Sequence, residues 1–590
     1  MTVFDALALV GGLCLFLFGM NIMGEGLERR AGNGLKSLLG KLTGSKLKGF
    51  LTGLGVTAVI QSSSATTVMV VGFVNSKIMT LRQSIGVIMG ANIGTTVTAW
   101  ILSLGGISSD NIVIQLLKPT SFTPILALVG IILTMFSKSS KKKDVGTILL
   151  GFATLMFGMD AMSGAVSGLA DVPAFQNLFL AFKNPILGVL VGALVTAVIQ
   201  SSSASVGILQ ALSATGAVSY AAAIPIIMGQ NIGTCITAML SSFGTNKNAK
   251  RAALVHLSFN VIGTVIWLSV FSIVSAVFNP LILSQSASYL GIAICHSVFN
   301  ILCTSILLPA SSLLEKLAYK LVPEGSAPEK AVELDERLLN TPAIALAQCK
   351  RLASKMASGA VEGFHLSIEA ISAYTAEKAQ RVRDIEDATD KYEDVLGTYL
   401  AKLSKNQVSD EDSAEISMLL KAIGDLERIS DHAVNVIESV EELREKGIEL
   451  SESASAELSV LSSASEEILT LTERAFSENS VSVAYEVEPL EEIIDNLKSK
   501  LRDSHIVRLK GGECTVEAGF IWADLLTNFE RASDHCSNIA LGVIDMHHNN
   551  MNAHQALRDI KESDGDFAQK VKFYSEKYSL LGITNESAVR

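Results

Sequence analysis

The feature that most constrains this chain is a ten-residue sequence, VTAVIQSSSA, which occurs at residues 56–65 and again, unchanged, at residues 195–204. The same offset of 139 residues pairs the Asn-Ile-Gly-Thr sequence at 92–95 with its copy at 231–234. Self-similarity at one fixed offset over this distance indicates a duplication. The first part of the chain is therefore predicted to contain two copies of one structural unit.

The two copies are predicted to lie in a membrane. Residues 1–330 carry a net charge of +10 and residues 331–590 a net charge of −21, which together give the overall −11. Most charge-poor runs before residue 310 approach the ~20 apolar residues that a helix needs to cross a bilayer. We therefore expect an all-α polytopic protein, with membrane repeat 1 at residues 1–139 and repeat 2, with additional spans, at residues 140–310.

Each copy contains a short apolar run, the sequence Gln-Ser-Ser-Ser, and a second short apolar run. Neither run can cross the bilayer alone, and a polar break inside a membrane is tolerated where it lines a cavity enclosed by protein. This pattern predicts a re-entrant hairpin in each repeat. The next run, residues 85–104, is predicted to be broken in the same way by its Asn-Ile-Gly-Thr-Thr sequence.

Basic residues in the connections predict the orientation in the membrane. They are concentrated at residues 29–48, 138–143 and 247–251, whereas segments 166–184 and 278–287 contain a single lysine between them. If each hairpin is re-entrant, all three basic connections lie in the cytoplasm and the two repeats are inverted. We expect a multi-pass protein of the cytoplasmic (inner) membrane with its N-terminus outside, seven full crossings and a cytoplasmic tail. Inverted repeats are common in secondary transporters.

The polar breaks are the candidate binding site. An oxyanion such as phosphate needs hydrogen-bond donors, which half-helix N-termini and hydroxyl groups supply, and hydroxyl and carbonyl oxygens suit sodium. The predicted substrate and ion ligands share polar side chains at or near the breaks: Gln61, Ser62, Ser63, Ser64, Thr66, Asn92, Thr95, Gln200, Ser201, Ser202, Ser203, Ser205, Asn231 and Thr234.

A purely structural interpretation competes with this one, because small polar residues also join helices in membranes. That interpretation explains single serines, but it explains poorly why four polar residues recur at one place in a duplication. For Asn92, Thr95 and their copies, helix kinking competes with ion binding. Asp160, the counterpart of Asn21, is a candidate for binding sodium or carrying a proton, and an interfacial acid near a helix end is the alternative.

The two Gln-Ser-Ser-Ser segments and the two glycine-to-threonine segments, 90–95 and 229–234, resemble those of the type II sodium-dependent phosphate cotransporter family. The resemblance covers about residues 1–310. It implies that the serine-rich segments meet at the centre of the protein and bind phosphate and sodium. It does not set the direction of transport.

Prolines punctuate residues 309–342, so residues 311–342 are predicted to be a linker. Residues 343–580 then show helical periodicity with charged outer faces, which is typical of an antiparallel helical bundle. A second duplication occurs here, because Glu-Arg-Ile-Ser-Asp-His at 427–432 returns as Glu-Arg-Ala-Ser-Asp-His at 530–535.

Acidic pairs four residues apart lie in both halves of the tail, and two like charges at this spacing repel unless a cation or an arginine lies between them. The repeated context therefore predicts a divalent or ferric metal at Glu427, Asp431, Glu530 and Asp534. For the further pairs Glu386/Asp390 and Glu491/Asp495, an ordinary solvated acidic face is a strong competitor.

The tail resembles PhoU-like regulatory domains over about residues 340–560, which implies a regulatory module linked to phosphate and open to a regulatory protein partner. No motif indicates an enzyme or a nucleic-acid surface. The predicted function is sodium-coupled phosphate transport across the lipid bilayer by alternating access. The alternatives are transport of another oxyanion and a non-transporting phosphate sensor. The oligomeric state does not follow from the sequence.

Overall fold

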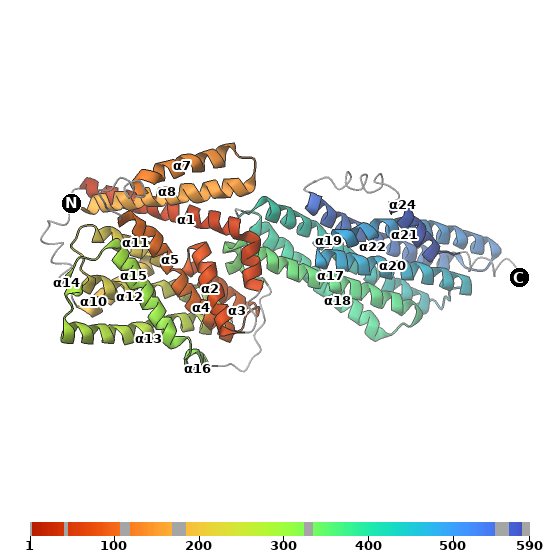
Figure 1. Ribbon diagram of the computed structural model, residues 1–590. Helices are drawn as coiled ribbons and strands as arrows, with labels where there is room; N and C mark the ends of the chain where they lie inside the picture. The colour runs from red at the N-terminus through yellow and green to blue at the C-terminus, as the bar shows by residue number, and fades with distance from the viewer. Residues whose placement is uncertain are drawn as a thin grey trace. The chain divides into compact units, whose positions relative to one another are not determined.

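The computed structural model describes residues 3–40, 45–106, 119–167, 184–323, 334–406, 408–548 and 566–580. The chain divides into two compact units, Met1–Ile344 and Ala345–Arg590. We call them the membrane unit and the tail unit. The described residues are almost entirely helical, as predicted, and the helices are labelled in Figure 1.

The membrane unit contains six helices that are long and apolar enough to cross a bilayer, by length and composition, within the described residues. Its helices are α1 (Val3–Gly40), α2 (Lys46–Ile60), α3 (Ser63–Asn75), α4 (Leu81–Gly94), α5 (Thr96–Ser103), α7 (Pro119–Phe136), α8 (Ser140–Ser167), α10 (Pro185–Ile199), α11 (Ser202–Ser213), α12 (Tyr220–Ser241), α13 (Lys247–Phe278), α14 (Leu281–Ser284), α15 (Tyr289–Leu307) and α16 (Ser311–Leu321). The offset of 139 superposes the starts of α2 and α10, of α3 and α11, and of α4 and α12.

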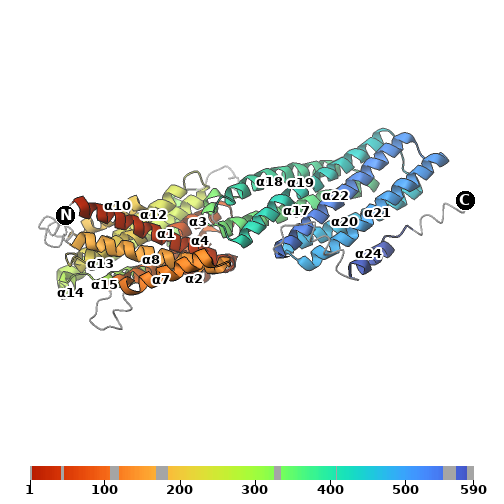
Figure 2. The ribbon, with the colours of Figure 1, turned by 90° about the horizontal axis from the view of Figure 1, so that it is seen from above.

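Helices α1 and α8, which correspond in the duplication, lie side by side (Figures 1 and 2). A Cβ atom on Gly12 would lie 2.9 Å from the carbonyl oxygen of Gly158, and one on Gly19 would lie 2.7 Å from that of Gly151. The absence of side chains here lets the backbones touch, as in other membrane helix pairs. Contacts that move forward along α1 move backward along α8, so two equivalent helices run antiparallel. This is the relation that an inverted repeat requires.

Helices α2 and α4 also pack through glycines, but they run parallel. A Cβ atom on Gly86 would lie 2.7 Å from the carbonyl oxygen of Lys46, and one on Gly94 would lie 2.7 Å from that of Leu54. Because α4 starts beside the start of α2, the intervening α3 must return the chain to the side from which α2 began. Helices α2 and α3 therefore form a hairpin that turns back, and α10 and α11 repeat this arrangement beside α12.

The second predicted break is much smaller than the first. Between α4 and α5, Thr95 keeps right-handed helical angles (φ −58°, ψ −30°). In repeat 2, α12 continues through residues 231–234 without interruption. The predicted break at residues 92–96 is therefore present in repeat 1, but without the left-handed residue found at Gln-Ser-Ser-Ser, and it is absent from α12. The polar side chains are satisfied by carbonyls of their own helix, for example Asn231 by Ile227 and Thr234 by Gln230.

The predicted linker contains ordered structure. Residues 311–321 form α16, whose Ser311, Leu314 and Ala318 face the membrane unit. Further along the chain, the 3₁₀ helix η2 (Glu336–Asn340) is fastened to the membrane unit by a polar cluster. We call Asn75, Asp335 and Arg337 the clasp.

In the clasp, the buried Asp335 accepts a hydrogen bond from Asn75 at the end of α3 (2.7 Å) and pairs with Arg337 (2.9 Å). Arg337 also donates to the carbonyl oxygens of Ser241 (2.6 Å) and Phe243 (3.1 Å), where α12 ends. Charge-assisted bonds to a buried carboxylate are among the stronger polar contacts. The segment that precedes the tail is thus attached to the second arm of the first hairpin.

The tail unit is a bundle of long helices, which Figure 2 shows running along one another. They are α17 (Pro342–Ser372), α18 (Ala376–Leu403), α19 (Asp410–Glu445), α20 (Glu452–Glu478), α21 (Val481–Gly511), α22 (Val516–His548) and α24 (Asp566–Lys577). Its core is apolar and includes the ring pair Phe364 and Phe529, with centroids 5.6 Å apart.

Candidate functional site

The two Gln-Ser-Ser-Ser segments meet in one cavity. This cavity, which we call the central cavity, has a volume of about 410 Å³ and is lined by residues 60–65 and 200–203 together with residues of α1. The two segments also touch directly, because the Ser64 hydroxyl donates to the carbonyl oxygen of Gln200 (3.3 Å). Segments separated by 139 residues in sequence are thus brought together, and residues from both repeats face the same space.

The backbone at the two breaks is the same. Gln61 (φ 60°) and Gln200 (φ 59°) both adopt the left-handed conformation, which is uncommon for residues other than glycine. Each ends a helix, and the following serine caps the next one: Ser62 accepts from the amide of Ala65, and Ser201 does so from Ala204. A left-handed residue is a common way to end a helix, and here it ends the first arm of both hairpins.

The helix termini determine which charges the cavity favours. Helices α3 and α11 begin at the cavity, so their N-termini present amide donors and the positive end of the helix dipole. Ser63, Ser202 and Ser203 are buried and line the cavity, and no hydrogen bond of their hydroxyl groups is found among the described residues. Helices α2 and α10 end at the same place and present carbonyl oxygens. The cavity can therefore hold an anion and a cation close together.

The sequence did not single out the acidic side of the cavity. Glu25 and Glu28 of α1 line it, together with Asn21 and Gly24. Asn21 donates to Glu25 (2.6 Å), whereas Oε1 of Glu28 is buried and has no hydrogen-bond partner in the described part of the chain. The spacing of these residues places them on one helix face, and that spacing is a signal that could have been read from the sequence.

Several predicted ligands lie outside the lining of the cavity. Thr66 is buried between the hairpin arms, where it donates to the carbonyl of Ser62 and accepts from Thr57 (both 3.0 Å). Its counterpart Ser205 is also buried, with its hydroxyl unpartnered within the described ranges. Asp160 is exposed on α8 and does not line the cavity either.

The Asn-Ile-Gly-Thr residues join helices. Asn92 contacts α13, through His256 Nε2 (3.2 Å) and Asn260 Oδ1 (3.5 Å). Thr95 donates to the carbonyl of Ala91 one turn earlier. With Asn231 and Thr234 bonded to their own helix, all four residues are placed in helix packing and outside the lining of the cavity.

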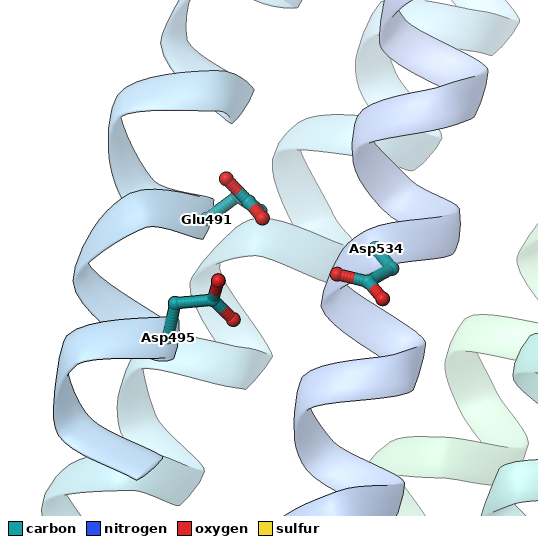
Figure 3. Close-up of side chains that lie close together, drawn as sticks. All are labelled: Glu491, Asp495 and Asp534. Atoms are coloured by element: carbon teal, nitrogen blue, oxygen red, sulfur yellow. The ribbon is translucent and has the colours of Figure 1, made fainter. Parts of the chain in front are cut away.

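The tail acids are grouped differently from the prediction. Among the described residues, Glu491, Asp495 and Asp534 have carboxylate oxygens within 4.8 Å of one another, and Figure 3 shows the first two on one helix facing Asp534 on the next. Glu530 instead pairs with Lys498 (2.9 Å), and Arg428 lies near Asp431 (3.6 Å). The predicted set of four acids is thus not one cluster.

The tail acids are crowded. Burial, together with the neighbouring Glu530 and Asp495, raises the pKa of Asp534 above its usual value. Burial and the adjacent Asp431 likewise raise the pKa of Glu427. A hard cation would relieve this repulsion, and carboxylate oxygens are its preferred ligands. The group of Glu491, Asp495 and Asp534 fits such an ion by its chemistry.

Sequence comparison decides the family. The profile of the Na+/Pi-cotransporter family matches twice, at residues 15–164 and 156–295, and the profile of the PhoU domain matches at residues 353–440 and 458–543. The chain belongs to the Na+/Pi-cotransporter family. Both matches are double, in agreement with the two duplications. The family consists of transporters, which confirms that the chain is not an enzyme.

The relatives of this chain match different shares of it. A Salmonella typhimurium protein named "Putative inorganic phosphate export protein YjbB" is 24% identical over 549 residues, 91% of this chain and 97% of that protein. The uncharacterized protein YqeW of Bacillus subtilis is 30% identical over 312 residues, 53% of this chain and 96% of its own length. The human sodium-dependent phosphate transport protein 2B is 39% identical over 133 residues, 21% of this chain and 18% of its own.

Among solved structures, the phosphate transport system regulatory protein PhoU from Streptococcus pneumoniae matches 36% of this chain and 99% of its own. The sequence identity is 19% and the TM-score 0.33.

Proposed function

We propose that this member of the Na+/Pi-cotransporter family moves inorganic phosphate together with sodium, by alternating access around the central cavity. The observation that carries the proposal is the meeting of both Gln-Ser-Ser-Ser segments in one cavity. A non-transporting sensor needs a ligand site but has no need of two equivalent hairpins that enter from opposite repeats. Family membership supports phosphate and sodium over another oxyanion.

We assign the phosphate to the serine side of the cavity. Ser63, Ser202 and Ser203 lie at the first turns of α3 and α11, where hydroxyl groups and free amides converge. Donors at a helix N-terminus suit a phosphate oxyanion. Of the ligands predicted from sequence, we retain residues 61–64 and 200–203 for the site, because these line the cavity.

Outward transport is a second candidate. It is favoured by the name of the Salmonella relative, which matches 91% of this chain.

The basic connections support a cytoplasmic position for residue 141 and an external one for residue 167. In intact cells, we expect a cysteine introduced at 167 to react with an impermeant reagent and one at 141 to be protected. The reverse result would refute the inner-membrane topology with a cytoplasmic tail.

The tail is proposed to regulate transport, since the PhoU matches cover most of it. A divalent or ferric ion at Glu491, Asp495 and Asp534 would be part of that control. An ion that binds only the folded tail stabilises it by mass action. Added metal should therefore raise the melting temperature of the wild type, and substitution of these three acids by the corresponding amides should abolish the shift.

Flux into proteoliposomes tests the main proposal. We expect radiolabelled phosphate to enter when a sodium gradient is imposed, with sulfate a poor competitor. Ser63→Ala and Ser202→Ala should each lower flux ten- to a hundredfold, because a lost hydrogen bond to a charged group costs about 1.5–3 kcal/mol. Sodium-independent flux would refute the coupling, and absence of flux in either direction would favour the sensor.

A further inference from the structure

The charged side chains that line the central cavity are both acidic, although the proposed cargo is an anion. They are Glu25 and Glu28 of α1. A phosphate beside two uncompensated carboxylates would be repelled. Either a cation accompanies it or a proton neutralises an acid, so the acidic side must hold a positive charge whenever phosphate is bound.

The two acids differ in their partners. Glu25 accepts a hydrogen bond from Asn21 and lies 4.0 Å from Arg29. Arg29 itself pairs with Asp144 of α8 at 3.0 Å, so its charge is shared. Among the described residues Glu28 forms no ion pair, and its buried Oε1 has no hydrogen-bond partner. Of the two acids, Glu28 is therefore the one without a direct ion pair in the described part of the chain.

Other oxygen atoms lie on the same side of the cavity. A Cβ atom on Gly24 would be 3.1 Å from the carbonyl oxygen of Ile60, the last residue of α2. Glu28 lies one turn further along the same face of α1, and Asn21 lies one turn before Gly24. A carboxylate, an amide and a helix-terminal carbonyl are together the oxygen ligands that a hard cation takes.

A second observation shows that the cavity is built to hold a ligand. Ser63, Ser202 and Ser203 are more than nine-tenths buried, line the same cavity and have no side-chain hydrogen bond in the described ranges. Their donors face the space from the opposite repeat arms. The cavity thus has an anion-binding side at the serines and a cation-binding side at α1.

We propose that Glu28 binds the coupling sodium ion, with the Ile60 carbonyl and Asn21 as further ligands, directly beside the phosphate. This inference rests on the proposed sodium-phosphate transport and adds the place of the cation. The duplication does not repeat it: the positions equivalent to Glu25 and Glu28 are Gly164 and Ser167. One such cation site is therefore expected in the membrane unit, on repeat 1.

The test compares wild type, Glu28→Gln and Glu28→Asp in proteoliposomes at fixed phosphate. We expect Glu28→Gln to raise the sodium concentration for half-maximal flux at least tenfold, and Glu28→Asp to restore part of the loss. Asp160→Asn, on the equivalent helix but outside the cavity, is the matched control and should leave the sodium curve unchanged. In detergent, sodium chloride should raise the melting temperature of the wild type relative to choline chloride, and this shift should disappear in Glu28→Gln.

The outcomes separate the two proposals. An unchanged sodium curve in Glu28→Gln, with sodium-driven flux in the wild type, would overturn the role of Glu28 alone. A changed pH profile with an unchanged sodium curve would assign a proton to Glu28 and also overturn the sodium assignment. Sodium-independent flux in the wild type would overturn the transport proposal and this inference with it.

Discussion

The two hairpins of the membrane unit have the same ten-residue sequence and the same backbone at the break, but they lie in different surroundings. Gln61 is 5% exposed and is held by two hydrogen bonds. Its side-chain amide donates to the Ala58 carbonyl, and its side-chain oxygen accepts from the Thr98 hydroxyl (2.8 Å). Gln200 is exposed. Identical residues in equivalent positions therefore have different contacts.

The arms of the two hairpins differ in the same way. In hairpin 1, formed by α2 and α3, the Thr57 hydroxyl donates to Thr66 across the two arms (3.0 Å). In hairpin 2, formed by α10 and α11, the equivalent Thr196 and Ser205 are buried, but neither hydroxyl has a partner within the described residues. Hairpin 1 is held more firmly by polar contacts. Two elements of equal sequence therefore have unequal contacts in this structure.

The largest expected effect tests what the hairpins share. Gly90→Ala and Gly229→Ala would each place a Cβ atom 2.0 Å from a backbone carbonyl oxygen, of Phe50 and Val189 respectively. Such a contact forces the helices apart and lowers the stability of the fold by about 1–3 kcal/mol or more. We expect both variants to lose monodisperse protein in size-exclusion chromatography. Gly55→Ala on α2, with no atom within 4 Å, is the control. Tolerance in only one repeat would show that the two scaffolds differ.

An intermediate effect sharpens the contrast between the glutamines. Gln61→Ala removes the partner of the Thr98 hydroxyl and of the Ala58 carbonyl, so it should destabilise the protein by about 1–3 kcal/mol. Gln200→Ala should leave stability unchanged and lower phosphate flux, because Gln200 is exposed at the cavity. Thermal unfolding and flux, measured on the same preparations, separate the two effects. Equal loss of stability in both variants would contradict the difference in burial.

The smallest effect concerns the threonines. Thr57→Val removes a hydrogen bond between the arms of hairpin 1 and should cost about 1 kcal/mol. Thr196→Val replaces a hydroxyl that is already unpartnered with a group of the same shape, so it should be neutral or slightly stabilising. Thermal unfolding of the two variants in detergent measures the difference. A larger loss for Thr196→Val would mean that its hydroxyl binds something in the native protein.

Much of the fold could be predicted from the sequence because the two copies of the duplicated segment have identical residues. Gln-Ser-Ser-Ser between short apolar arms predicted helical hairpins, and the structure shows a left-handed residue at Gln61 and again at Gln200. The helical bundle of the tail was predicted from helical periodicity, and its PhoU-like character from a resemblance. These features depend on neighbouring or regularly spaced residues, so they can be recognised in a single sequence.

Other features depended on tertiary placement. The sequence suggested that Asn92 and Asn231 break their helices. Whether an amide side chain does so depends on its hydrogen-bond partner, and Asn92 donates to Asn260 while Asn231 donates to the carbonyl of Ile227. Glu28 was passed over because only the packing of α1 against the hairpins brings it to the cavity. In the tail, Asp534 joined Glu491 and Asp495 because adjacent helices, and not matching motifs, bring acids together.

The clasp has a mechanical consequence. Asn75 ends α3, and Ser63 begins it at the cavity, so 13 residues of helix, about 20 Å at 1.5 Å per residue, separate the two. A hydrogen-bonded helix of this length transmits a push or a twist with little loss, because its backbone bonds leave it few soft torsions. Asp335 lies seven residues before Pro342, where α17 starts. Within the membrane unit, a displacement of Asp335 would therefore reach Ser63 through one continuous hydrogen-bonded helix.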